Sequence, residues 1–306
     1  MLIPPFLNRG DEVFLSSPAG CIQPECLQRG CSVLESWGLK VISGPHVSSQ
    51  YGMFAGTDKE RQADLQKALD TPEIKAIFCT RGGYGTARII DSLDFTEFLK
   101  SPKWIVGFSD ITVLLSHLQQ NLQTISLHAA MPQSYPPGAG KADSIALDSL
   151  YKALFGLEIN YFFPSQFPNR SGIAQAPLIG GNLSVLYSLR GTNTDIDPSG
   201  KILFIEDLNE YDYHIDRMLL NLFRGGWFEN LSGLIVGSFI QTKQGLHPYG
   251  KDVWEIISEY TAPFNYPVCY GFPAGHIPHN RALYMGKTAV LSVKGIGSVP
   301  SNLKFI

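Results

Sequence analysis

The chain has few cysteines and few charged residues, and each shortage excludes a class of protein. Five of its 306 residues are cysteine, an odd number unsuited to a disulfide framework, and we expect all five to be reduced thiols. Charged residues make up 17% of the chain, the formal net charge is −3, and no run of Lys and Arg is present. These features argue against nucleic acid or an anionic membrane as a partner.

Long hydrophobic segments are also absent. No stretch approaches the roughly 18 consecutive apolar residues that a transmembrane helix needs. The apolar start, residues 1–7, is short, contains Pro4 and Pro5, and lacks the basic region and longer apolar core of a secretory signal. We therefore expect a soluble, cytoplasmic protein.

The first half of the sequence alternates strand and helix patterns. Strands are predicted at residues 12–16, 40–43, 76–80, 104–108 and 125–129. Helices are predicted at residues 24–37, 58–69, 85–93, 110–122 and 144–154. This alternation is typical of βαβ units and predicts a mostly parallel sheet with helices on both faces.

The second half is less regular. Residues 132–140 are rich in Pro and Gly, and residues 156–176 carry further Pro, Asn, Ser and Gly, as connecting segments do. We predict an N-terminal domain at residues 1–155, a linker at 156–176 and a C-terminal α/β or α+β domain at 177–306. The strands expected in that domain are 201–205, 231–239, 267–271 and 289–293, and its helices are 182–189, 213–223 and 253–260.

One candidate for catalysis is a serine where a strand meets a helix. The apolar run 104–108 is followed by Ser109, and a helical pattern begins at Asp110. A nucleophile at such a junction lies beside amides and the positive end of a helix, which stabilise an oxyanion. Serine is also a favoured N-cap, and the cap alone would explain Ser109. The Gly-X-Ser-X-Gly pattern of α/β-hydrolases is not met, because Ile111 stands at the second glycine position.

A glycine-rich loop follows the predicted strand at 76–80. It contains Gly82, Gly83 and Gly85, which allow the backbone to approach a ligand closely. The spacing matches neither the dinucleotide-binding pattern nor the P-loop. We predict a ligand-facing loop on the same sheet edge as Ser109, with a plain tight turn as the alternative.

Two segments of the second half offer an acid and a base. Glu206 and Glu210 lie at and beyond the end of the run 201–205, where a carboxylate can orient an imidazole or cap the next helix. His276 lies in a stiff Gly/Pro loop and is either catalytic or bonded to nearby backbone. His279 follows, but neither a His-Glu-X-X-His pattern nor a nearby ligand set indicates a metal.

Taken together, these segments resemble the LD-carboxypeptidase family of serine peptidases, which includes the microcin C immunity peptidases. The resemblance rests on six short motifs in the family's order, spread over nearly the whole chain. They are Ser-Pro-Ala-Gly at 17–20, Arg-Gly-Gly-Tyr-Gly at 81–85, Gly-Phe-Ser-Asp at 107–110, Gly-Gly-Asn-Leu at 180–183, Ile-Glu-Asp at 205–207 and Gly-His-Ile-Pro at 275–278. Each motif is weak alone, and the ordered set is specific.

The resemblance implies a Ser-Glu-His triad. Ser109 matches the nucleophile, Glu206 the acid and His276 the base, and Glu210 is the rival for the acid. The chemistry it implies is acyl transfer without a metal or an organic cofactor.

The resemblance also implies the groups around the triad. The amides of Asp110 and Gly83 would form an oxyanion hole. The substrate would carry a free carboxylate after the scissile bond, and Arg81 and Tyr84 are the candidate substrate contacts.

The implied fold is a flavodoxin-like parallel-sheet N-terminal domain and a smaller, β-rich α/β C-terminal domain, in a homodimer. A triad divided between the domains would depend on their docking. The implied activity is release of terminal D-Ala from murein tetrapeptides during cell-wall recycling. The alternatives are an immunity peptidase acting on a microcin C-like peptidyl or aminoacyl nucleotide, with Trp227 or Tyr249 as aromatic platform, and a non-catalytic binding protein of the same fold.

Overall fold

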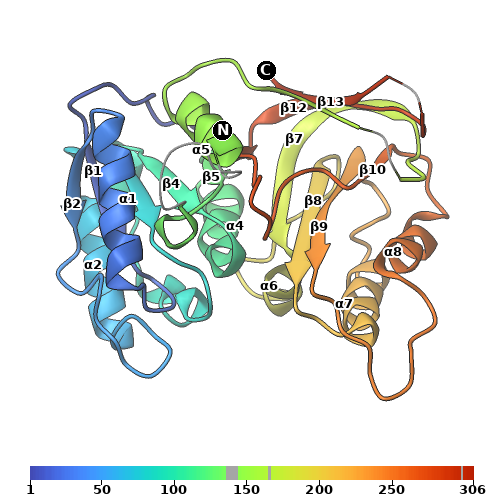
Figure 1. Cartoon of the computed structure of the whole chain (residues 1–306), viewed down its shortest axis with the longest axis horizontal. Helices are drawn as coiled ribbons and strands as arrows, with labels where there is room; N and C mark the ends of the chain where they lie inside the picture. The colour runs from blue at the N-terminus through green and yellow to red at the C-terminus, as the bar shows by residue number, and fades with distance from the viewer. Residues whose placement is uncertain (136–143, 165–166, 298) are drawn as a thin grey trace. The chain divides into compact units, whose positions relative to one another are not determined.

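The computed structural model describes residues 1–135, 144–164, 167–297 and 299–306 (Figure 1). The chain forms two compact units. The first unit comprises residues 1–158 and 278–284, and the second comprises residues 159–277 and 285–306. Among the described residues, no helix has the length and apolar character that crossing a membrane requires.

The first unit is built on a six-stranded sheet with the strand order β11-β5-β4-β3-β1-β2. Its strands are β1 (Glu12–Ser16), β2 (Lys40–Ser43), β3 (Ile74–Cys79), β4 (Trp104–Gly107), β5 (Ser126–His128) and β11 (Leu283–Met285). All pairs among β1 to β5 are parallel. The central strands β3 and β4 are almost wholly buried, which explains their near-continuous apolar sequences.

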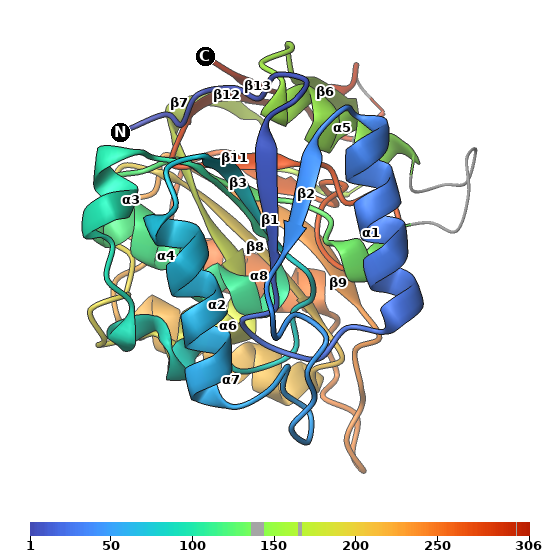
Figure 2. The same cartoon turned by 90° about the vertical axis from the view of Figure 1, so that its left-hand side faces the viewer.

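In the part of the chain that the structure describes, five α-helices cover this sheet. They are α1 (Pro24–Ser36), α2 (Asp58–Asp70), α3 (Thr96–Lys100), α4 (Thr112–Asn121) and α5 (Ser144–Leu154). Figure 2 shows α1 and α5 on one side of the sheet and α2, α3 and α4 on the other. The local sequence explains where α1 and α2 begin. Pro24 is the first residue of α1, and Thr57 forms a capping box with Glu60 at the start of α2.

The second unit contains a seven-stranded sheet with the order β10-β9-β8-β7-β12-β13-β6. Its strands are β6 (Asn160–Phe163), β7 (Gly172–Asn182), β8 (Ile202–Leu208), β9 (Gly233–Ile240), β10 (Val268–Tyr270), β12 (Thr288–Val293) and β13 (Ser301–Phe305). Strands β7 to β10 pair in parallel. The pairs of β12 with β7 and β13, and of β13 with β6, are antiparallel.

Among the described residues of the second unit, three helices accompany the sheet: α6 (Leu183–Ser188), α7 (Asp212–Arg224) and α8 (Val253–Thr261). Their apolar residues form one buried cluster with β8 and β9, in which Ile215 and Met218 of α7 join Leu203 and Val236. The two sheets confirm the predicted fold class, a parallel α/β sheet followed by a β-rich α/β part.

The helix predicted at 85–93 is wrong. The chain forms two single-turn 3₁₀ helices there, Thr86–Arg88 and Ile90–Ser92. Gly85 has a φ of +142°, which is incompatible with a right-handed helix, and the Thr86 N–H donates to the Asp110 carboxylate at 2.9 Å. A tertiary contact therefore overrides the local helical pattern.

The linker predicted at 156–176 is also partly wrong. It contains β6 and the first residues of β7, whose buried and exposed side chains alternate as in other half-buried strands. The surrounding prolines and small polar residues hide this alternation in the sequence. Of the predicted connection at 132–140, residues 136–140 lie outside the described part of the chain.

The predicted C-terminal domain, 177–306, is not one continuous body. Residues 278–284 belong to the first unit, where the Ala282 N–H donates to Ser149 Oγ at 2.9 Å and the Tyr284 O–H donates to the Ala153 carbonyl at 2.6 Å. These partners are more than 130 residues apart in sequence. Such a pairing leaves no local signal from which a boundary can be predicted.

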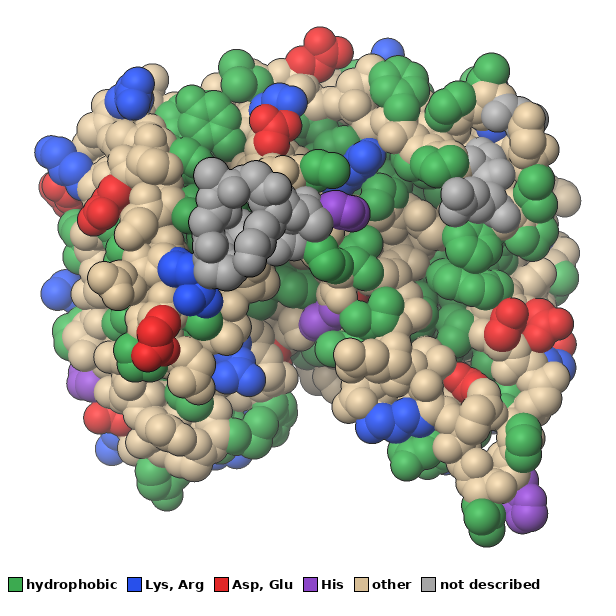
Figure 3. All heavy atoms as spheres, viewed as in Figure 1, with side chains coloured by type: hydrophobic (Ala, Val, Ile, Leu, Met, Phe, Trp, Pro, Cys, Tyr) green, Lys and Arg blue, Asp and Glu red, His purple; other side chains and the backbone are tan. Residues whose placement is uncertain are grey.

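The thiols and the surface charge follow the composition. All five cysteines are free thiols. On the face shown in Figure 3, acidic and basic side chains are interspersed and form no continuous patch of one sign.

Lys103 supports a stability prediction for the first unit. Its side chain is buried, and its ammonium donates to the carbonyls of Ala68, Leu69 and Thr71 at the end of α2. We expect Lys103→Met to lower the free energy of unfolding by about 2–4 kcal/mol, because it leaves buried carbonyls without donors. Denaturant unfolding followed by circular dichroism measures this loss.

Lys100→Met is the matched control. Lys100 is exposed and forms an ion pair with the exposed Glu97, so its replacement should change the free energy of unfolding by less than about 0.5 kcal/mol. Equal losses for the two variants would contradict a capping role for Lys103.

Candidate active site

Ser109 lies at the carboxyl end of β4, the central strand of the first sheet. It opens a 3₁₀ turn, Ser109–Ile111, that leads into α4. Its φ is +62°, a left-handed conformation that is uncommon for a residue with a side chain. Phe108 and Ile111 are the N-cap residues of the turn and of α4, so Ser109 caps neither. The strained backbone favours a functional explanation of Ser109 over the helix cap.

The departure from the Gly-X-Ser-X-Gly pattern has a steric explanation. A Cβ on Gly107 would lie 2.7 Å from Ile111 Cγ2. The Ile111 side chain therefore fills the space that Gly107 leaves open. The turn needs one glycine before the serine and an apolar residue after it.

The glycine-rich loop contacts the Ser109 turn. A Cβ on Gly82 would lie 2.9 Å from Ser109 Cβ and 3.0 Å from its Oγ. Gly83, with a φ of +111°, faces Gly20 instead, and a Cβ there would lie 3.6 Å from the Gly20 Cα. Gly82 is thus the glycine in contact with Ser109, and the sequence motif alone did not distinguish it from Gly83.

The side chain of Asp110 joins the same loop. Its Oδ2 accepts the Thr86 N–H at 2.9 Å and the Thr86 O–H at 2.7 Å. Burial raises the pKa of Asp110, while the bonds from Thr86, the charge of Arg61 and the Gly85 amide act in the opposite direction.

The two candidate substrate contacts lie on this loop. Arg81 Nη1 donates to the Cys21 carbonyl at 2.7 Å. Tyr84 is 47% exposed, and its ring packs against Phe54 with centroids 5.9 Å apart. Arg81 is therefore held by one nitrogen, and Tyr84 presents much of its ring to solvent.

The second unit brings a histidine and a carboxylate together. Glu206, near the end of β8, is fully buried, and its Oε2 lies 2.7 Å from His276 Nδ1. Because an ionised carboxylate can only accept, this bond requires a proton on Nδ1, and in the neutral imidazole Nε2 then carries the lone pair. Gly275 makes this approach possible, since a Cβ there would lie 2.4 Å from Ser238 Oγ and 2.7 Å from Glu206 Oε2.

The rival acid has a different partner. Glu210 Oε2 lies 2.6 Å from Nδ1 of His214, four residues along the chain. Glu206 is therefore the carboxylate that contacts His276, and Glu210 belongs to a separate pair at the start of α7.

Sequence reasoning assigned no role to Asn182, which is bonded to Glu206, or to Asp207, which shares Asn182 with Glu206. Asn182 Nδ2 donates to Glu206 Oε1 at 3.3 Å and to Asp207 Oδ1 at 3.1 Å. Asp207 also accepts the N–H groups of Ser184 and Leu208, both at 2.8 Å. The motif Gly-Gly-Asn-Leu at 180–183 was the available signal, because it places an asparagine at the N-cap of α6.

These carboxylates act on the histidine. Burial lowers the pKa of His276, but the hydrogen bond to Glu206 and the charges of Glu206 and Asp207 outweigh burial, and the pKa is raised above its ordinary value. Burial and the adjacent Glu206 charge raise the pKa of Asp207 to about 7, against the pull of its N–H donors. The two carboxylates therefore stabilise the protonated imidazole, which is the form that a general base adopts after it has taken a proton.

Within the described ranges, no group of three or more His, Cys, Asp and Glu side chains could hold a metal ion. The two histidines considered as a pair belong to different units, His276 to the second and His279 to the first.

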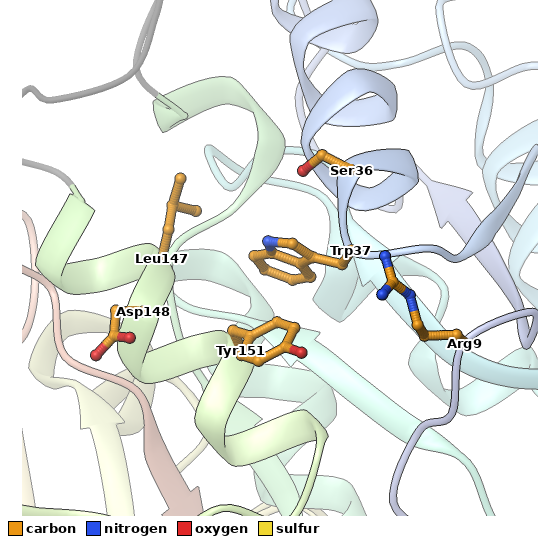
Figure 4. A pocket seen from close by; sticks show the side chains of 6 residues that line it. All are labelled: Arg9, Ser36, Trp37, Leu147, Asp148 and Tyr151. Carbon is orange, nitrogen blue, oxygen red and sulfur yellow. The ribbon is translucent and has the colours of Figure 1, made fainter.

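A separate hollow of about 380 Å³ lies in the first unit (Figure 4). Trp37, Tyr151 and Leu147 line it together with Arg9, Ser36 and Asp148. Arg9 precedes β1 and Trp37 follows α1, so the hollow lies at the amino edge of the sheet, opposite Ser109. It contains none of the predicted site residues.

Comparison with known proteins places this geometry in a family. Residues 13–129 match the LD-carboxypeptidase N-terminal domain, and residues 175–291 match the LD-carboxypeptidase C-terminal domain. A probable murein peptide carboxypeptidase of Bacillus subtilis is 35% identical over 94% of this chain and 91% of its own length. The murein tetrapeptide carboxypeptidase of Pseudomonas aeruginosa is 34% identical over 91% of this chain and 92% of its own length.

Solved structures agree. A muramoyltetrapeptide carboxypeptidase from Oxalobacter formigenes is 30% identical, with a TM-score of 0.86 over 96% of this chain and 98% of that one. The microcin C7 self-immunity protein MccF, in its wild-type apo state, has a TM-score of 0.89 over 100% of this chain and 98% of that one. It is 21% identical, so that likeness shows a shared fold alone. We conclude that this chain is a hydrolase of the LD-carboxypeptidase family.

Proposed function

We propose that this protein hydrolyses the L,D-amide bond that releases the terminal D-amino acid from murein tetrapeptides. The single observation that carries the proposal is the bond between buried Glu206 and His276, which gives the second unit a preformed acid–base pair. The strained Ser109 of the first unit supplies a matching nucleophile. The relatives named for murein peptides support the choice of substrate.

In the proposed reaction, His276 Nε2 takes the proton of Ser109 Oγ as the oxygen attacks the carbonyl carbon of the scissile amide. Glu206 stabilises the imidazolium that forms. The imidazolium then protonates the leaving amine, the D-amino acid departs, and an acyl-enzyme ester remains on Ser109. Water, deprotonated by His276, hydrolyses this ester and restores the serine.

The tetrahedral intermediates carry a negative oxygen. We propose that the backbone amides of Asp110 and of the glycine loop, at Gly83, donate to it. The contact of Gly82 with Ser109 supports a place for this loop beside the reacting atoms. Arg81 is the proposed contact for the substrate carboxylate. One of its nitrogens is bonded to the Cys21 carbonyl, and a guanidinium can bind a carboxylate through two N–H groups. Tyr84 is a second proposed contact with the substrate.

We further propose that the protein acts in the cytoplasm, in recycling of murein peptides, as a homodimer. Five free thiols are typical of a reducing compartment.

The immunity-type activity is less well supported. Stacking on a nucleobase needs an exposed aromatic ring, and Trp227 is 3% exposed, with the Arg190 guanidinium 5.2 Å from its ring centroid. Tyr249 is half-buried and packs against the apolar cluster of the second unit.

Ser109→Ala tests the nucleophile and the substrate. We expect the variant to fold normally and to release no D-alanine from murein tetrapeptide above background, because no other hydroxyl replaces the attacking oxygen. Chromatography of the released amino acid is the measurement. Undiminished release by Ser109→Ala would overturn the mechanism.

The same assay separates the candidate functions. Wild-type protein is incubated with murein tetrapeptide and, in parallel, with an aminoacyl-sulfamoyl adenosine. Turnover of the tetrapeptide alone supports the proposal, turnover of the adenosine compound alone supports an immunity peptidase, and turnover of neither would favour a binding protein.

Glu206→Gln and Glu210→Gln test the acid as a matched pair. We expect Glu206→Gln to lower kcat by about 10²–10⁴-fold, because the amide no longer favours the imidazolium. Glu210→Gln should stay within about threefold of the wild type, because Glu210 contacts His214 instead. The opposite ranking of kcat would assign the acid to Glu210.

The raised pKa of His276 predicts the pH dependence. Only the neutral imidazole accepts the Ser109 proton, so kcat/KM should fall as the pH drops through a value above about 6.5, the ordinary pKa of histidine. Glu206→Gln removes the charge that raises this pKa, and the acid limb of its residual activity should move to lower pH. An acid limb at the same pH in both proteins would show that Glu206 does not act on the base.

A further inference from the structure

The glycine-rich loop touches Ser109, and the structure shows what holds it there. The contact is made at Gly82, while the loop is anchored three residues later, at Gly85 and Thr86. Both anchoring bonds come from side chains that the sequence motifs did not assign a role, Arg61 of α2 and the carboxylate of Asp110.

The Gly85 peptide is held from both sides. Arg61 Nη1 donates to the Gly85 carbonyl at 3.0 Å, and the N–H of the same peptide, that of Thr86, donates to Asp110 at 2.9 Å. A Cβ at position 85 would lie 2.5 Å from Arg61 Nη1. The next residue, Thr86, is fully buried and gives both its N–H and its O–H to Asp110. Two donors from Thr86 thus converge on one oxygen of the Asp110 carboxylate.

The same arginine also binds the loop between β1 and α1. Arg61 is 1% exposed and donates to the Pro18 carbonyl. Two residues on, the Gly20 N–H donates to the Gly82 carbonyl at 3.1 Å. The glycine loop is therefore bonded at Gly82 and at Gly85, and the two bonds are linked through Arg61.

We propose that Asp110, Thr86 and Arg61 are positioning residues that hold the glycine loop at the distance from Ser109 at which its amides meet the oxyanion. We call these three side chains the loop clamp. The inference rests on the proposed acyl transfer, since it concerns the amides used there. The Asp110 carboxylate follows the nucleophile directly in sequence, so the clamp fixes the loop relative to Ser109 itself and not only to the sheet.

A purely structural carboxylate would be expensive here. Asp110 is 4% exposed, and burial of an ionised group is costly unless donors surround it. An apolar residue would fill the same space at lower cost. The donors to Asp110, the N–H and O–H of Thr86, belong to the loop that contacts Ser109, which argues for positioning.

Thr86→Val is the test. It removes the O–H that bonds to Asp110 and keeps the shape of the side chain. We expect kcat on murein tetrapeptide to fall about 10- to 100-fold with KM within about twofold. Displaced amides donate less well to the oxyanion of the transition state, whereas binding of the substrate depends little on them. Hydrogen exchange of the amides at 82–86 should be faster in the free variant.

Two control variants accompany it. Thr86→Ser keeps the O–H and should recover kcat to within about threefold of the wild type. Thr96→Val removes a similar bond, from the Thr96 O–H to Asp94 at 2.6 Å, in an exposed turn of the same unit. It should leave kcat and the exchange of residues 82–86 unchanged.

Wild-type kcat and wild-type exchange in Thr86→Val would overturn the clamp, and so would a loss of kcat without faster exchange. If Thr86→Val does not fold, Asp110→Asn takes its place, and wild-type kcat in that variant overturns the clamp. Wild-type protein inactive on murein tetrapeptide would defeat the proposed function instead, and the exchange rates would still decide whether the clamp orders the loop.

Discussion

A serine with a φ of +62° at the end of a buried strand is the constraint on which the first unit depends. Such a conformation costs about 1–3 kcal/mol and persists only where the surroundings hold it. Here β4 is buried along its whole length, Ile111 fills the space beside Gly107, and Asp110 is bonded to Thr86. The rest of the turn can be understood as what keeps Ser109 in this conformation.

The second unit solves a different problem, which is to keep a charged group out of water. Glu206 is buried, and its two oxygens are bonded to His276 and Asn182. Each unit therefore completes its own part of the proposed chemistry with internal bonds. The first holds the proposed nucleophile and the proposed oxyanion amides, and the second holds the proposed base and acid. Because these polar groups are already held in place, few of them would have to move at the moment of proton transfer.

The sequence predicted those features that are encoded locally. The strands of the first half appear as short apolar runs, and Ser109 and His276 stand in recognisable motifs. What it could not predict depends on contacts distant in sequence. β6, β7, β11 and β13 were missed. The short patterns of β6, β11 and β13 gain meaning only from their partners, and β7 begins inside the segment that was predicted as a linker. The sequence also did not decide whether Gly82 or Gly83 contacts Ser109, or whether Glu206 or Glu210 contacts His276. These contacts arise from the fold.

The adjacent carboxylates of Glu206 and Asp207 impose a compromise on the base. Two buried negative charges side by side are unfavourable, and Asn182 reduces that cost by donating to both. Glu206 and Asp207 together raise the pKa of His276. The imidazole is thereby a stronger base, but a smaller fraction of it is neutral near pH 7. Asp207 has a pKa of about 7, so its own charge declines in the same pH range and relieves part of the effect on His276. The charge of Asp207 therefore changes as His276 takes up its proton, and the shape of the acid limb belongs to these two groups and not to His276 alone.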